Sequence, residues 1–100
     1  MSDDELRAIF RDELEDVSTS IDTAAARLEG APEPERGRIS LELRRAFHTL
    51  KGAAQAVGDV EVEEACQHAE AAIAARAGDF VAIGAIARGV LPILRRRLAA

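Results

Sequence analysis

Apolar residues recur every three or four positions along four stretches of the chain, a spacing that predicts four amphipathic α-helices. The apolar positions of the first stretch are Leu6, Phe10, Leu14, Val17, Ile21, Ala24 and Leu28. Those of the second are Ile39, Leu43, Ala46, Leu50, Ala53 and Val57. The third carries Val62, Cys66, Ala69 and Ile73, and the fourth Phe80, Ile83, Ala87, Val90, Leu94 and Leu98. No stretch alternates in the way typical of a β-strand.

Capping and turn residues stand between these stretches. Ser2 followed by Glu5 matches a capping box, and Pro34 suits the first turn of a helix. Gly58-Asp59 and Gly78-Asp79 each combine a helix stop with an N-cap residue. We therefore expect helices over residues 3–29, 34–57, 59–77 and 79–98. Because the connecting loops are short, residues 1–100 should form one all-α domain, an antiparallel four-helix bundle of up-down-up-down order.

Composition narrows the classes of function. A chain of 100 residues has room for one domain, and 48% apolar against 31% charged residues indicates a globular one. The net charge of -5 argues against nucleic acid as a partner, because a phosphate backbone repels an acidic surface. No apolar run approaches the ~20 residues of a membrane span, and the first residues lack the features of a signal peptide. We expect a cytoplasmic protein without membrane insertion.

His48 faces away from the apolar side of the second helix. At about 100° per residue, Ile39 and Val57 lie about 180° from it around the helix axis. An imidazole in this position is exposed to solvent and able to act as a nucleophile. The residues within about 60° of His48 on the same face are Leu41, Arg44, Lys51, Gly52 and Gln55.

Two neighbours distinguish His48 from an ordinary surface histidine. Lys51, the only lysine of the chain, follows it by three residues, so its ammonium can reach a phosphoryl group on the imidazole. Gly52 lies one helical turn after His48. Within a helix, glycine lowers stability by about 1 kcal/mol relative to alanine, and the need for room for a phosphoryl group beside the ring would explain why glycine is present. Taken singly, each has an ordinary explanation: an inert histidine, a solvated lysine, a helix-packing glycine. Their arrangement on one face indicates phosphoryl chemistry.

These residues carry a resemblance to a known family. The stretch from Ala46 to Gly58, AFHTLKGAAQAVG, closely resembles the His-x-x-Lys-Gly motif of histidine-containing phosphotransfer domains. The preceding helix, with Phe10-Arg11-Asp12-Glu13-Leu14-Glu15, is similar to the amino-terminal phosphotransfer domain of the chemotaxis kinase CheA. The resemblance covers most of the chain and weakens after about residue 76. It implies that His48 is phosphorylated, with Lys51 and Gly52 as its supporting neighbours.

The third helix supplies a further candidate. His48 lies ten residues before the turn at Gly58, so an antiparallel helix returns to its level near residue 68. Gln67 and Glu70 bracket that level; in the family a histidine often occupies the place of Gln67. A carboxylate that accepts a hydrogen bond from one ring nitrogen would fix the tautomer and leave the other nitrogen free. An ordinary surface role for Glu70 is an equal alternative.

The resemblance also implies the partners. A histidine kinase catalytic domain, in the same polypeptide or another, would supply ATP and Mg²⁺, and a response-regulator receiver would bring its aspartate and a Mg²⁺ of its own. The chain has no Gly-rich nucleotide loop and no carboxylate cluster for metal, so we expect no kinase active site and no bound cofactor or metal in the domain itself. The expected partner contacts are Leu41, Arg44, Arg45 and Gln55.

Other interpretations stay open. A helical interaction or dimerisation module would show the same apolar spacing without phosphorylation of His48. For Leu41, packing against a bent first helix is the alternative to a partner contact. A metal-binding bundle lacks the expected Glu-x-x-His pairs. We interpret His68 as a surface residue and Cys66 as a small core residue, and a single cysteine excludes an internal disulfide. The arginines at residues 95–97 suit the negative end of a helix dipole or solvent.

Overall fold

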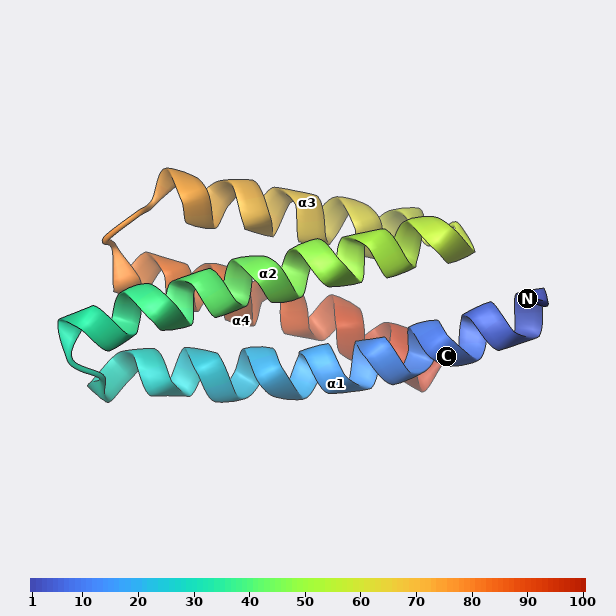
Figure 1. Ribbon diagram of the computed structural model, residues 1–100, viewed down its shortest axis with the longest axis horizontal. Helices are drawn as coiled ribbons and strands as arrows, with labels where there is room; N and C mark the ends of the chain where they lie inside the picture. The colour runs from blue at the N-terminus through green and yellow to red at the C-terminus, as the bar shows by residue number, and fades with distance from the viewer.

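All four stretches with helical spacing are α-helices in the computed structural model, which describes residues 1–100. The helices are α1 (Asp3–Gly30), α2 (Glu33–Val57), α3 (Val60–Ala75) and α4 (Phe80–Ala99). Each runs antiparallel to the one before it, and α4 returns to pack on α1, so both termini lie at the same end of the bundle (Figure 1). The bundle measures 44 × 21 × 21 Å. The predicted all-α antiparallel bundle is confirmed.

Side-chain caps begin α1, α3 and α4 where the sequence predicts them, and α2 begins without one. Backbone N–H groups donate to Ser2 Oγ from Glu5 (3.2 Å), to Asp59 Oδ1 from Val62 (3.2 Å) and to Asp79 Oδ1 from Ala82 (3.1 Å). Gly58 (φ 73°) and Gly78 (φ 86°) take the left-handed conformation that ends α2 and closes the turn before α4. The third helix ends at Ala75, two residues before the predicted end, because Arg76 begins that turn: its carbonyl accepts from Asp79 N–H at 2.9 Å.

The buried face of α2 differs from the predicted one. Its buried residues are Ile39, Leu43, Phe47, Leu50 and Ala54, whereas Ala46, Ala53 and Val57 are only half-buried. Since α2 packs between α1 and α3, its buried stripe is centred about 40° closer to Lys51 than the apolar spacing alone suggests. Lys51 therefore lies at the edge against α3, while the side chain of His48 stays 66% exposed.

The end of the bundle near both termini is held by ion pairs. Arg97 Nε donates to Asp59 Oδ2 at 2.8 Å, and the Asp59 side chain is buried. The neighbouring arginines also pair with other helices, Arg96 with Glu61 at 3.5 Å and Arg95 with Asp22 at 3.8 Å. Arg96 and Arg97 lie in the last turn of α4, at the negative end of its dipole as interpreted, and Arg97 in addition joins the end of α4 to the cap of α3. None of the four helices combines the length and apolar character needed to cross a membrane.

Candidate functional site

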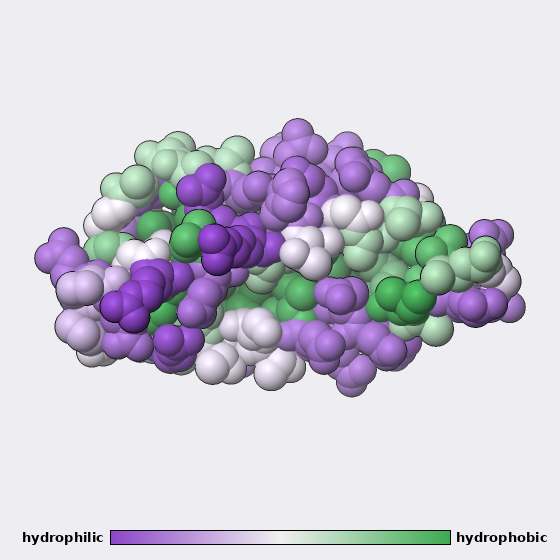
Figure 2. Space-filling view, viewed as in Figure 1, coloured by the Kyte–Doolittle hydropathy of each residue, from purple (hydrophilic) through white to green (hydrophobic).

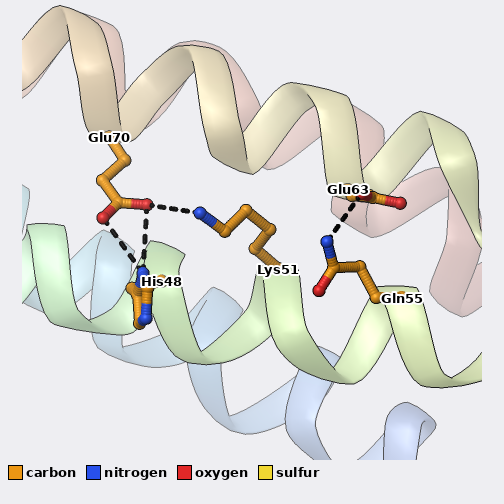
Figure 3. Close-up of polar contacts among 5 residues, drawn as sticks. All are labelled: His48, Lys51, Gln55, Glu63 and Glu70. Atoms are coloured by element: carbon orange, nitrogen blue, oxygen red, sulfur yellow. Dashed lines mark hydrogen bonds and ion pairs between the residues drawn. The ribbon is translucent and has the colours of Figure 1, made fainter.

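The imidazole of His48 is held by a carboxylate from the neighbouring helix. His48 Nδ1 lies 3.1 Å from Glu70 Oε1 and 3.4 Å from Oε2, which joins α2 to α3 at the level that the antiparallel register predicts (Figure 3). An ionised carboxylate can only accept a hydrogen bond, so Nδ1 carries the hydrogen and donates it. Nε2 is then the unprotonated nitrogen, and its lone pair is available to an electrophile.

Lys51 completes this arrangement from the same helix as His48. Its ammonium donates to Glu70 Oε2 at 3.3 Å (Figure 3), and only about a quarter of either side chain is exposed. Burial raises the pKa of Glu70, but the hydrogen bonds and charges of Lys51 and His48 outweigh that effect and lower the pKa below its ordinary value of 4.5. Glu70 is therefore an anion at neutral pH and can accept from both partners.

Gly52 is open on its outer side. A Cβ built at this position would meet no atom within 4 Å, so the glycine is not a close helix-packing contact. Side chains on an α-helix lean toward the amino terminus, so any side chain at residue 52 would lean toward the turn that carries His48. The missing side chain thus keeps free the space beside the exposed imidazole.

A shallow surface depression of about 330 Å³ surrounds the imidazole. Its lining residues are Leu41, Arg44, Arg45, His48, Thr49 and Glu70. Neither Arg44 nor Arg45 forms an ion pair or a side-chain hydrogen bond. An exposed nucleophile with a fixed tautomer and free cations beside it is suited to accept a phosphoryl group.

A family comparison agrees with this geometry: the family model described as "Hpt domain" matches residues 5–99. The chain belongs to the Hpt family. Comparison with curated proteins and with solved structures gives no match. Hpt domains carry out histidine phosphotransfer in phosphorelay signalling, and they interact there with kinases and receiver domains.

The other predicted site residues of this Hpt domain lie around the hydrogen-bonded pair of His48 and Glu70. Gln67 is exposed and makes no hydrogen bond to His48 or Glu70. Gln55 Nε2 donates to Glu63 Oε2 at 2.9 Å, a contact between α2 and α3 one turn beyond Lys51 (Figure 3). Leu41 is 42% exposed at the rim of the depression. Thr49, which also lines the depression, was not predicted from the sequence, because it lies about 100° from His48 around the helix axis.

The remaining histidine and the cysteine lie outside the site. His68 is exposed and makes no side-chain hydrogen bond. Cys66 is fully buried in the core, as its apolar position predicts. Burial, together with the negative charge of Glu70, raises the pKa of the Cys66 thiol to about 12. The thiol is therefore protonated at neutral pH and is a poor nucleophile.

Proposed function

We propose that this Hpt domain accepts a phosphoryl group on Nε2 of His48 and passes it to the aspartate of a response-regulator receiver. The observation that carries the proposal is the hydrogen bond from His48 Nδ1 to Glu70. It assigns the hydrogen to one nitrogen and leaves the other exposed with its lone pair. An exposed histidine without such a partner would divide its hydrogen between both nitrogens.

The proposed transfer needs no proton movement on the domain. The Nε2 lone pair attacks the γ-phosphorus of ATP held by the kinase, the bond from that phosphorus to the bridging oxygen breaks, and ADP leaves. The ring then carries a positive charge, which Glu70 balances through Nδ1–H. In the second step an aspartate oxygen of the receiver attacks phosphorus, the N–P bond breaks, and the ring becomes neutral again. Kinase and receiver supply the Mg²⁺ for their own steps.

Glu70 and Lys51 act as positioning residues in this proposal. Glu70 holds the ring by Nδ1, and Lys51 holds Glu70 by its second oxygen. This role differs from the one expected for Lys51, whose ammonium was predicted to reach the phosphoryl group itself. The difference follows from the buried face of α2, which brings Lys51 against α3 and within 3.3 Å of the carboxylate.

The receiver is proposed to dock on the face of α2 around His48. Leu41 and Arg44 line both the depression at His48 and an adjoining groove formed by α2, the end of α3 and the start of α4, whose other lining residues include Ile73, Ala74 and Phe80. This groove lengthens the partner surface toward the start of α2. Arg45 and Gln55 are the other proposed partner contacts; the hydrogen bond of Gln55 to Glu63 leaves it the least free of them.

A chemotaxis kinase is the proposed setting. It is supported by the resemblance of the first helix and of the stretch around His48 to the phosphotransfer domain of CheA. The kinase catalytic domain would then belong to the same polypeptide or act in trans. We propose the cytoplasm as the location, since the kinase requires ATP.

The test uses a histidine kinase catalytic domain, ATP and Mg²⁺, followed by intact mass measurement and addition of a receiver. We expect the wild-type domain to gain the mass of one phosphoryl group and to lose it when the receiver is added. His48→Gln should gain none while keeping the helical circular dichroism of the wild type. Equal labelling of the wild type and His48→Gln would overturn the proposal and favour a helical interaction module.

A further inference from the structure

The two nitrogens of the His48 ring face different surroundings. In Figure 3 the nitrogen bound by Glu70 points toward α3, and the other nitrogen points away from α3. Both Glu70 and Lys51 therefore lie on the Nδ1 side of the ring. A phosphoryl group on Nε2 would be on the opposite side, away from the Lys51 ammonium.

Arg45 is the basic residue on the Nε2 side. On the helix wheel it lies about 60° from His48 in the direction away from Lys51, and Gly52 lies about 40° from His48 on that same side. Arg45 precedes His48 by three residues and Gly52 follows it by four, so the two occupy the turns before and after the ring. Because helix side chains lean toward the amino terminus, the imidazole leans over the turn that carries Arg45.

The guanidinium of Arg45 is free to bind an anion. Arg45 is exposed, lines the same depression as His48 and pairs with no carboxylate. Other basic residues are already engaged, such as Lys51 with Glu70 and Arg97 with Asp59. Figure 2 shows strongly hydrophilic side chains gathered over the first half and middle of α2, the part of the helix that contains Arg44 and Arg45.

We propose that Arg45 donates hydrogen bonds to the phosphoryl oxygens on Nε2 of His48, in the space that Gly52 leaves open. This inference rests on the proposed function and adds the residue that binds the transferred group. Arginine suits the role because its planar fork offers two parallel N–H donors to a phosphoryl group. Lys51, in contrast, acts on the reaction through Glu70.

The experiment requires no protein partner. The domain is phosphorylated with phosphoramidate, and the ³¹P resonance of the adduct is followed as a function of pH in the wild type and in Arg45→Ala. Loss of a cation that contacts the phosphoryl group should raise the pH at which the resonance titrates, by about half a pH unit or more. Arg45→Lys keeps the positive charge but lacks the two parallel N–H donors of the guanidinium. Its resonance should titrate at a pH between those of the wild type and Arg45→Ala.

Arg38→Ala is the matched control. Arg38 is also an exposed, unpaired arginine on this side of α2, but it lies ten residues before His48, about 15 Å along the helix axis. The ³¹P resonance of phosphorylated Arg38→Ala should titrate like that of the wild type. This control separates the effect of a direct contact with the phosphoryl group from the effect of removing one positive charge. A wild-type titration in Arg45→Ala would overturn the assignment of Arg45 alone. A wild-type domain that takes up no phosphoryl group would overturn the proposed function and this inference with it.

Discussion

Glu70 accepts hydrogen bonds from His48 and Lys51 in a setting where three-quarters of its side chain is buried. Its charge stays in place because those two partners lower its pKa, against the opposite effect of burial. At the scale of single residues, the proposed chemistry of the domain thus depends on which nitrogen of the His48 ring carries a hydrogen. The two neighbours of His48 in the motif contribute in different ways. Lys51 donates a hydrogen bond to the Glu70 carboxylate, and Gly52, which has no side chain, leaves the space beside the imidazole open.

Glu70→Gln tests the control of the tautomer. A glutamine can donate its amide N–H to Nδ1, which would move the hydrogen to Nε2 and block the attacking lone pair. We expect phosphorylation several-fold slower than in the wild type, and ¹⁵N chemical shifts of the ring that report Nε2–H instead of Nδ1–H. Retention of the Nδ1–H form with a normal rate would make Glu70 an ordinary surface residue.

Two substitutions of Gly52 separate stability from transfer. Gly52→Ala should stabilise the domain by about 0.5–1 kcal/mol, because alanine is the better helix former and its Cβ meets no neighbour. Gly52→Glu should leave the domain folded but block phosphorylation, because it adds bulk and negative charge beside the ring. Thermal unfolding and phosphorylation by a kinase domain measure the two effects. A normal rate in Gly52→Glu would show that the space beside the ring is not used.

At the scale of the helices, α2 serves the core with one face and the candidate site with another. The pairing of α2 with α3 brings Glu70 to His48, and the groove between them extends the exposed surface past Leu41. A different contact, the ion pair of Arg97 with the buried carboxylate of Asp59, joins the start of α3 to the end of α4. Docking and stability are thus assigned to different ends of these helices and can be tested separately.

Leu41→Ala tests the docking face. Since Leu41 is 42% exposed, its truncation should lower the free energy of unfolding by less than about 1 kcal/mol. Transfer from phosphorylated His48 to a cognate receiver should nevertheless weaken several-fold, because an exposed apolar contact is lost. Ile9→Ala on α1, where Ile9 is 48% exposed, is the matched control and should transfer normally. A large loss of stability with normal transfer would place Leu41 in the core.

Arg97→Ala tests the contact between α3 and α4. It leaves the buried Asp59 carboxylate without its charged partner, which should cost about 1–3 kcal/mol of the free energy of unfolding in urea. Arg96→Ala removes a pair with the exposed Glu61 and should cost less than about 1 kcal/mol. Equal effects of the two substitutions would show that burial of Asp59 adds nothing to the pair.

At the scale of the whole molecule, apolar spacing and capping residues were enough to predict four helices and their order. The antiparallel register placed Glu70 near the level of His48, but it left a contact with the ring and an ordinary surface role as equal alternatives. Those features depend on local periodicity and on the register of an antiparallel pair. The burial of Phe47 and the contact of Lys51 with Glu70 were not predictable, because they depend on how α2 rotates between α1 and α3. The pair of Asp59 and Arg97 joins residues far apart in the chain, and no local pattern marks it.

The charge of the molecule is also distributed unevenly. The chain carries a net charge of -5, yet Arg44 and Arg45 stand unpaired beside the exposed nucleophile. An acidic molecule with a local basic patch can attract anionic groups to that patch while repelling them elsewhere. The local arginines, and not the net charge, thus favour approach of a phosphoryl donor, or of an acidic receiver site, at His48.

The proposed function depends most directly on which nitrogen of His48 becomes phosphorylated. The measurement is phosphorylation of ¹⁵N-histidine-labelled domain by phosphoramidate, followed by intact mass and by ¹⁵N and ³¹P NMR of the adduct. The proposed function predicts one phosphoryl group, on Nε2 of His48, with His68 unmodified and the adduct absent from His48→Gln. An adduct on Nδ1 of His48, or equal modification of His48 and His68, would contradict it.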